Sequence, residues 1–316
     1  MTARSILVTR ATGTQGIAVC RHLRQKGFIV HGLARNISDE RTAPLKGLDI
    51  EFFQGTEEDR DAVDRAVAGC AGVFLNTMPN MRESGSEARQ SKTVLETAKA
   101  AGVEQVVNST SIGVGRLDTI RSDLKTSLPT QVIQGKVEVE AAVRDAGIET
   151  WTILRSGYFM NNFLWPLGNV MFPELASERK FISSYAPDTP LALIDPDDIG
   201  AFTAAAFEDP SRFAGEVFEL VGEKLPTEQA IEKLSAAVGM PIEAVYRTAE
   251  ESEALAQSNP MVASQLMTLP IHKLADMTRA KSFGITMHTF DEFLTREKDS
   301  VRATFALEHG DAIKLF

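Results

Sequence analysis

The sequence predicts an α/β protein with a Rossmann-type, doubly wound parallel sheet and a smaller C-terminal α/β region that binds substrate. Three observations favour this fold class. Short β-rich runs alternate with helical patterns through the first half of the 316-residue chain. The first strand pattern leads into a glycine-rich turn and a helix, as in dinucleotide-binding units. Beyond Arg155 the alternation loosens into a stretch rich in aromatic residues, asparagine, proline and glycine.

The first of these patterns is a β–α–β unit at the start of the chain. Residues 5–9 are strand-like, residues 15–26 are helical and end at Gly27, and residues 28–34 form a second strand pattern. The turn TRATGTQG over residues 9–16 holds Gly13 and Gly16. In such a turn the glycines let the main chain approach a pyrophosphate, and amides at the helix N-terminus bind it.

The alternation then continues along the chain. Strands are predicted at 50–54, 72–77, 105–109 and 150–155, and helices at 57–68, 84–101 and 135–145. Ligands of open parallel sheets bind at the carboxyl ends of the strands. We therefore expect the site in the loops that follow Val8, Leu33, Asn76 and Ser109.

The chain divides into two predicted regions. Residues 1–155 form the dinucleotide-binding domain, and residues 156–316 form the smaller substrate-binding region, with part of 190–221 packing back on the sheet. In this second region the patterns predict a helix at 195–207, a strand at 216–221, a helix at 227–238 and a strand at 242–247. Residues 248–316 are predicted to be helical.

Composition limits the classes of partner and the location. Lys and Arg total 33 against 43 Asp and Glu, a formal charge of −10, which opposes nucleic acid or an anionic membrane as the main partner. No leader and no bilayer-spanning run is evident, so we expect a cytoplasmic protein. Cys20 and Cys70 lack metal spacing and are interpreted as buried thiols. The five histidines are scattered, and no metal site is predicted.

Several stretches together resemble a known family. They are VTRATGTQG at 8–16, ARN at 34–36, AAVRDAGIETWTILRSGYFMNNF at 141–163 and DPDDIGAFTAAAFEDP at 195–210. The chain resembles the NmrA-like group of atypical short-chain dehydrogenase/reductases, which includes isoflavone-reductase-like and quinone-reductase-like enzymes. That group mixes NADPH-dependent reductases with members that bind NADP but only sense redox state or regulate transcription factors.

The end of the second strand indicates which cofactor is preferred. An acidic residue there would accept a hydrogen bond from a ribose 2′-hydroxyl, but Arg35 follows instead, and a guanidinium matches a 2′-phosphate. NADP(H) is therefore favoured over NAD(H), although a solvated charge at the strand end is the simpler alternative. The predicted cofactor-binding residues are Arg10, Thr12, Gly13, Thr14, Gln15, Gly16, Arg35, Asn76, Thr77 and Lys136.

Two positions depart from the family pattern. Arg10 stands where the first glycine of the turn is expected, and it could fold away, lie against the phosphates as an extra cation, or obstruct dinucleotide binding. Gly55-Thr56 stands where the family has Gly-Asp, so a contact on the adenine side is expected to be missing.

The resemblance also points to candidate catalytic residues. Lys136 matches the family's lysine, which beside a nicotinamide can bind the ribose and lower the pKa of a proton donor. The tyrosine that classical relatives place one helical turn earlier is absent, because residue 132 is Val. We therefore expect Lys136 and Tyr158 to be catalytic, with a surface charge and a packing role as their respective alternatives. The predicted substrate-side residues are Ser109, Ser111, Tyr158, Asn161 and Asn162, one of the asparagines being a possible turn cap.

These features predict an NADP(H)-dependent oxidoreductase that reduces a small or mid-sized, apolar carbonyl or activated alkene. The alternative is a non-catalytic, NADP-sensing regulator that acts through a protein partner. A third possibility is a cofactor-independent isomerase or cyclase on the same scaffold, which Arg10 brings into consideration.

Overall fold

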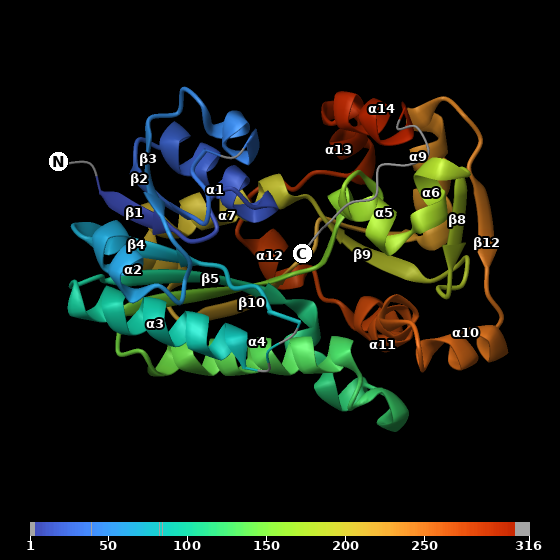
Figure 1. Ribbon diagram of the computed structural model, residues 1–316, viewed down its shortest axis with the longest axis horizontal. Coiled ribbons are helices and arrows are strands. Elements are labelled where there is room, and N and C mark those ends of the chain that lie inside the picture. Colours follow the sequence, from blue (N-terminus) through green and yellow to red (C-terminus); the bar gives the residue numbers. More distant parts are fainter. Residues whose placement is uncertain (1–3, 39, 82, 84, 307–316) are drawn as a thin grey trace.

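The computed structural model describes residues 4–38, 40–81, 83 and 85–306. It falls into two halves, of which the left-hand one in Figure 1 holds a large parallel sheet. Seven strands within the described residues form this sheet in the order β10-β6-β5-β4-β1-β2-β3, with every pairing parallel. Its strands are β1 (Ser5–Val8), β2 (Ile29–Ala34), β3 (Ile50–Gln54), β4 (Cys70–Leu75), β5 (Gln105–Ser111), β6 (Thr150–Ser156) and β10 (Glu216–Leu220). This arrangement confirms the predicted Rossmann-type fold class.

Helices cover both faces of the sheet (Figure 1). One face carries α1 (Thr14–Gln25) and α7 (Pro196–Glu208), and the other carries α2 (Arg60–Val67), α3 (Ser86–Ala100) and α4 (Leu128–Asp145). Side chains of β1 alternate between the two layers, so that Ile6 and Val8 pack toward α1 and α7 while Leu7 packs toward α2 and α3. The apolar run in β1 is therefore buried on both sides, as in other doubly wound sheets.

The chain leaves the sheet after β6 and returns to it later. β10 pairs with β6, with Glu216 opposite Thr152, and α7 packs along α1. Both elements lie within residues 190–221, the segment that we expected to pack back on the sheet. The predicted domain boundary at residue 155 therefore divides a sheet to which both regions contribute.

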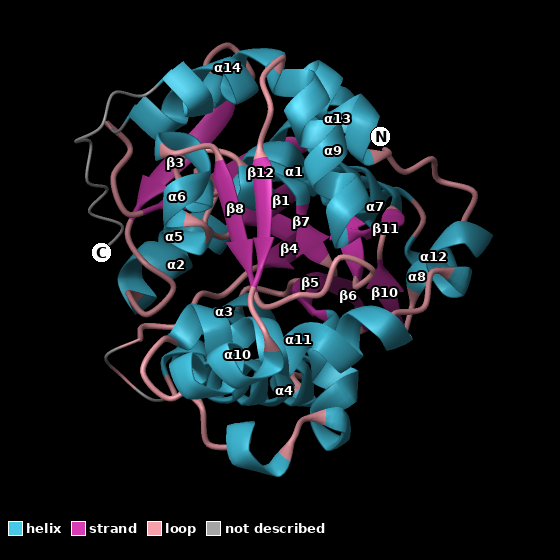
Figure 2. Ribbon diagram, turned by 90° about the vertical axis from the view of Figure 1, so that its right-hand side faces the viewer, coloured by secondary structure: helices cyan, strands magenta, loops and turns pink. Residues whose placement is uncertain are grey.

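The second half holds two small sheets and most of the short helices (Figure 2). Its strands are β7 (Tyr158–Phe159), β8 (Lys180–Ser183), β9 (Pro190–Ile194), β11 (Glu223–Pro226) and β12 (Glu243–Tyr246), which pair as β11-β9-β7 and β12-β8. The helices after β6 other than α7 are η4 (Met160–Phe163), α5 (Leu167–Met171), α6 (Pro173–Ser177), α8 (Pro210–Phe213), α9 (Thr227–Val238), α10 (Ala249–Ala256), α11 (Pro260–Leu274), α12 (Thr278–Ser282), α13 (Phe290–Arg296) and α14 (Lys298–Ala306). Buried rings of Phe163, Phe172, Phe181 and Phe290 form its core.

Some predicted boundaries differ from the structure. α4 begins at Leu128 rather than at Gly135, because Pro129 suits the first turn of a helix and the Thr130 hydroxyl donates to the Leu124 carbonyl at 2.8 Å. The predicted helix 84–101 begins at Ser86, and residue 84 lies outside the described residues, as do residues 307–316 of the predicted helical stretch. Short 3₁₀ helices also occupy Glu40–Leu45 (η1), Ile112–Thr119 (η2) and Ser122–Leu124 (η3).

The cysteines and the lengths of the helices can be compared with the sequence analysis. Cys20 and Cys70 are both buried, free thiols. Across the described ranges, every helix is too short or too polar to cross a bilayer.

The contact between α1 and α7 depends on a glycine. A Cβ atom at Gly200 would lie 2.7 Å from the Ala18 carbonyl oxygen and 2.7 Å from a ring carbon of His22. Such distances are shorter than van der Waals contact, so the missing side chain is what lets the two helices approach this closely.

We expect Gly200→Ala to destabilise the protein, measured as the free energy of unfolding in urea. At an open helix position the same change would stabilise by up to about 1 kcal/mol through helix propensity. Here the added methyl group must push α7 away from α1, and overpacking of this kind costs about 1–3 kcal/mol. A stability equal to or above that of the wild type would show that the two helices do not pack as described.

Candidate functional site

The turn after β1 keeps the backbone of a glycine turn although Arg10 occupies it. Arg10 has a φ of 50°, in the left-handed region that non-glycine residues adopt only at a cost. The Gly13 amide donates to the Arg10 carbonyl at 2.8 Å, and the Ala11 amide donates to the Leu33 carbonyl at 3.0 Å. The substitution is therefore absorbed as local strain of about 1 kcal/mol or more, and the turn is not rearranged.

Gly16 holds the N-terminus of α1 against this turn. A Cβ at Gly16 would lie 2.2 Å from the Arg10 carbonyl oxygen and 2.8 Å from the Ala11 Cα. α1 begins after Gly13 without a side-chain cap, so the first-turn amides of Thr14 and Gln15 have no intrahelical acceptor. The Gln15 Oε1 atom is also buried without a partner. This helix end is open to an anion.

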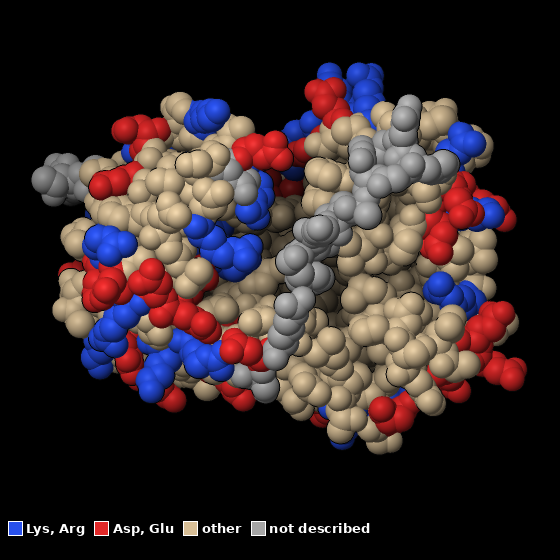
Figure 3. Space-filling view, viewed as in Figure 1, with Lys and Arg blue, Asp and Glu red and all other residues tan. Residues whose placement is uncertain are grey.

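A small cavity lies beside the turn at the end of β2, and arginines line it. Arg10, Arg35 and Arg41 surround it together with Glu57, and Thr12 and Gly13 complete the wall on the turn side. In the part of the chain that the structure describes, Arg35 has no hydrogen-bond or ion-pair partner. β2 belongs to the left-hand half of the molecule, where Lys and Arg side chains gather beside the hollow between the two halves (Figures 1 and 3).

Sequence reasoning missed two charged residues that line this cavity, Glu57 and Arg41. Glu57 follows the Gly55-Thr56 pair, and its place after the third strand was a signal that it belongs to the same edge of the sheet. It is only 5% exposed, and its Oε2 atom lies 4.0 Å from Nη1 of Arg10. Burial raises the pKa of Glu57, and Arg10 opposes this shift. Arg41, in the 3₁₀ helix η1, had no sequence signal that would have placed it here.

Lys136 on α4 is held by an acidic residue that the sequence analysis did not single out. Its Nζ atom donates to Oε1 of Glu87 at 2.9 Å, and the Thr77 hydroxyl donates to the same oxygen at 3.0 Å. Glu87 lies in the first turn of α3 and is buried. The structure thus links two predicted cofactor residues, Thr77 and Lys136, through Glu87.

The remaining predicted residues at the sheet edge are engaged in local structure. The Asn76 amide donates to Oγ1 of Thr9 at 2.8 Å, which fixes the loop after β4. Ser109 Oγ lies 3.3 Å from Ser156 Oγ, and Ser111 Oγ accepts from the Gly113 amide at 3.3 Å as the cap of η2. The cofactor contact of Asn76 and the substrate contacts of Ser109 and Ser111 stay predictions.

Tyr158 and its neighbours lie just beyond β6. The Tyr158 hydroxyl is buried and makes no hydrogen bond of good geometry within the described chain. Burial, with Tyr185, raises the pKa of Tyr158 well above its usual value, and Asn162 opposes the shift. The phenol therefore stays protonated, so it can donate a hydrogen bond or act as a weak acid but does not act as a base.

Asn161 faces a different space from Tyr158. Its Oδ1 atom is buried without a partner, and the residue lines a cavity of about 220 Å³ between α1 and the second half of the molecule. Thr14, from the open helix end, lines the same cavity. The structure therefore brings together one predicted cofactor residue and one predicted substrate residue.

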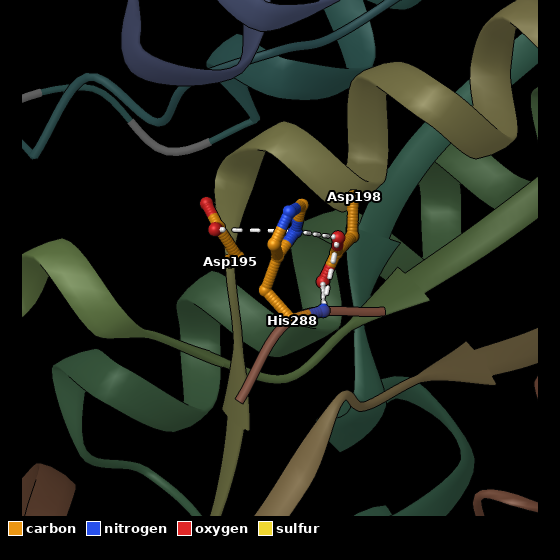
Figure 4. Close-up of side chains that lie close together, drawn as sticks. All are labelled: Asp195, Asp198 and His288. Atoms are coloured by element: carbon orange, nitrogen blue, oxygen red, sulfur yellow. Dashed lines mark hydrogen bonds and ion pairs between the residues drawn. The ribbon is translucent and has the colours of Figure 1, made fainter. Parts of the chain in front are cut away.

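Two aspartates of the DPDDIG stretch, Asp195 and Asp198, form a charged cluster with His288 that sequence reasoning did not foresee (Figure 4). Asp195 caps α7 by accepting from the Asp197 amide at 2.9 Å, and its two oxygens accept from Arg296 at 2.6 and 2.9 Å. Nδ1 of His288 lies 2.6 Å from Asp198 Oδ1. Burial and Asp195 raise the pKa of Asp198 to about 7, while His288 opposes the shift.

These acids and His288 are close enough to bind a metal ion, with ligand atoms within 4.8 Å of one another. The Arg296 guanidinium, however, already holds both oxygens of Asp195, and its charge would repel a cation. We therefore interpret the cluster as an ion-pair clamp between α7 and the segment from His288 to Arg296.

Together, the parallel sheet, the glycine turn after β1 and the open N-terminus of α1 define a Rossmann-like α/β protein of the nucleotide-binding type. The chain matches the NmrA-like family over residues 2–299, and it therefore belongs to that family.

Relatives of known name agree with this assignment. The chain is 30% identical to the (4-alkanoyl-5-oxo-2,5-dihydrofuran-3-yl)methyl phosphate reductase of Streptomyces griseus, over 97% of this chain and 98% of the relative. It also resembles the crystal structure of an NADPH-dependent quinone oxidoreductase from Escherichia coli, with a TM-score of 0.67 and 23% identity over 92% of this chain and 98% of the other. The structure of NmrA, a negative transcriptional regulator, in complex with NADP has a TM-score of 0.70 and 18% identity over 96% of each chain.

The clamp gives a test of stability. Arg296→Met leaves the Asp195 carboxylate, which is 0% exposed, without its guanidinium partner, whereas Arg296 itself is 34% exposed. Because the arginine is partly solvated, we expect a loss of about 2–3 kcal/mol in the free energy of unfolding, below the full cost of breaking a buried pair.

A matched control is Arg302→Met, which removes an exposed ion pair with Asp299 and should change stability by less than about 0.5 kcal/mol. The double variant Asp195→Asn, Arg296→Met should recover part of the loss, because the unpaired charge is gone. Equal, small effects of both single arginine substitutions would contradict the clamp.

Proposed function

We propose that the protein is an NADP(H)-dependent reductase of a small or mid-sized, mostly apolar substrate that carries a carbonyl group or an activated alkene. The observation that carries the proposal is the pairing of an open helix N-terminus with Arg35 at the carboxyl edge of the sheet. These two features lie where a dinucleotide binds in doubly wound folds.

The residues of the turn fit the cofactor. Gly16 leaves no side chain between α1 and the turn, and the amides of Thr14 and Gln15 would bind the pyrophosphate. Arg35 would bind the 2′-phosphate through two or more N–H groups of its guanidinium. When bound, NADPH supplies a hydride.

Lys136 and Tyr158 would handle the proton and the substrate. The Lys136 ammonium has three N–H donors, and Glu87 uses one, so the others can bind ribose hydroxyls or a water. Glu87 also holds the ammonium in place through a buried ion pair. The protonated Tyr158 hydroxyl can donate to a substrate oxygen, where it would stabilise developing negative charge.

The names of the relatives support the substrate class. The Streptomyces enzyme is named for a dihydrofuranone that carries an alkanoyl group and a methyl phosphate, and the Escherichia coli enzyme is named for quinones. Substrates of both kinds are electron-poor alkenes or carbonyls that accept a hydride. We therefore place this protein's substrate among activated alkenes and quinone-like carbonyls.

One observation favours a second function, that of a regulator that binds and senses NADP and acts through a protein partner. Lys136 is tied to Glu87, and the Tyr158 hydroxyl is buried, so neither catalytic candidate is freely available. A structural neighbour is named as a transcriptional regulator in complex with NADP. NADPH oxidation measured with a panel of quinones, enones and aldehydes separates the two functions, because a sensor binds NADPH but does not oxidise it.

Arg35→Ala tests the cofactor assignment. Loss of a charge-assisted hydrogen bond to the 2′-phosphate should weaken NADPH binding by about 1.5–3 kcal/mol. NADH lacks that phosphate, so its affinity should change little. Calorimetric titration of both dinucleotides gives the measurement, and equal losses for both would refute the role of Arg35.

Lys136→Ala tests the chemistry. On a substrate found in the panel, we expect turnover to fall by about 10²-fold or more, with a smaller loss of NADPH affinity. Tyr158→Phe keeps the ring and should slow the reaction only if its hydroxyl touches the substrate. Full activity of the Lys136 variant would mean that this lysine is not catalytic and that its bond to Glu87 is structural.

A further inference from the structure

The side chain of Arg10 does not obstruct the turn. Its backbone adopts the left-handed conformation that a glycine would supply, and its guanidinium lines the cavity at the end of β2. This cavity is lined by Leu33 and Ala34 of β2 and by Thr12 and Gly13 of the turn, so it lies between the turn and the end of β2, the strand end beside which the adenosine ribose of a dinucleotide binds.

Three positive charges converge on this cavity. Burial lowers the pKa of Arg10; Glu57 opposes that shift, and the nearby charges of Arg35 and Arg41 add to it. Arg35 and Arg41 are thus close enough to Arg10 for their charges to disfavour its charged form. Converging cations around a small cavity are the arrangement that binds a phosphate dianion.

Glu57 is the only acidic residue among the described residues that line the cavity. Its separation of 4.0 Å from Arg10 is at the outer limit of an ion pair, and no hydrogen bond joins the two side chains. The carboxylate is buried, so part of the Arg10 charge is used to balance it. A phosphate in the cavity would compete with Glu57 for the same guanidinium.

We propose that Arg10 is a second cation for the 2′-phosphate of NADP(H), reaching it from the phosphate-binding turn, and that Glu57 is the counter-charge that limits its strength. The proposal rests on the proposed function, since it requires a dinucleotide in this site. Arg10 then adds to the preference for the 2′-phosphorylated cofactor that Arg35 provides, and Glu57 reduces the part of the Arg10 charge that can act on the phosphate.

The test is a double-mutant cycle of Arg10→Met and Glu57→Gln on the full chain. Methionine is chosen because, like arginine, it adopts the left-handed conformation at a cost. The substitution therefore keeps the backbone strain and removes the guanidinium group. Calorimetry is performed with NADPH and NADH, and with the fragments adenosine 2′,5′-bisphosphate and AMP. The two fragments differ from each other in the 2′-phosphate, and both lack the nicotinamide. Arg60→Met, at an exposed pair with Glu96, is the control for net charge.

We expect Arg10→Met to weaken NADPH and the bisphosphate by about tenfold or more, the scale of a lost charged hydrogen bond. NADH and AMP should stay within about twofold, as should all four ligands with the Arg60 control. Glu57→Gln should tighten NADPH by about threefold, because Arg10 loses its competing partner. In the double variant most of that gain should disappear, since Arg10 is the nearest cation to Glu57, and the part that remains reports the weaker effect of Glu57 on Arg35.

Other results would overturn the proposal. Equal weakening of NADPH and NADH by Arg10→Met would place the arginine on the pyrophosphate, and no change would mean that it has no contact with the cofactor. A weaker NADPH affinity in Glu57→Gln would make Glu57 a support of the site and not a competitor. A wild-type protein that binds neither dinucleotide would refute the proposed function and this proposal together, whereas normal binding without altered preference refutes this proposal alone.

Discussion

The close approach of α1 to the turn after β1 is the constraint on which the rest of the structure depends. Without a side chain at Gly16, the first turn of α1 reaches the Arg10 carbonyl, which fixes the helix axis relative to the sheet. α7 then packs along α1 through Gly200, and the DPDDIG residues at the start of α7 hold the segment from His288 to Arg296. One missing Cβ at the sheet edge thus sets the position of elements from both halves of the chain.

Two cations at the candidate site each have a buried carboxylate beside them. Lys136 is paired with Glu87, and Arg10 faces Glu57. Burying a carboxylate costs solvation free energy, and the ion pair with the neighbouring cation offsets part of that cost. The consequence for ligand binding is that the site's positive charge is partly balanced before any anion arrives. Arg35 forms no ion pair within the described residues, although its charge also acts on Glu57.

The fold could be predicted from the sequence because it rests on local patterns. The alternation of strands and helices and the glycine spacing of the turn are visible in the chain itself, and the family resemblance agrees with them. The partners Glu87 and His288 could not be predicted, because an isolated acid or histidine gives no periodic signal and its partner is distant in sequence, whereas Glu57 was signalled only by its place after the third strand. Arg10 was recognised as unusual, but the sequence could not show that its backbone keeps the glycine conformation and its side chain turns toward β2.

The return of the chain to the sheet has a consequence for how the protein folds. β10 is the last strand of the large sheet, and it is made only after the chain has passed through β7, β8 and β9 of the second half. The apolar face of α1 is likewise covered by α7, an element distant from it in sequence. Contacts of such long sequence separation slow folding and leave apolar surface exposed while the chain is being synthesised. We therefore expect the nucleotide-binding half to complete its sheet and cover α1 only once α7 and β10 have been made.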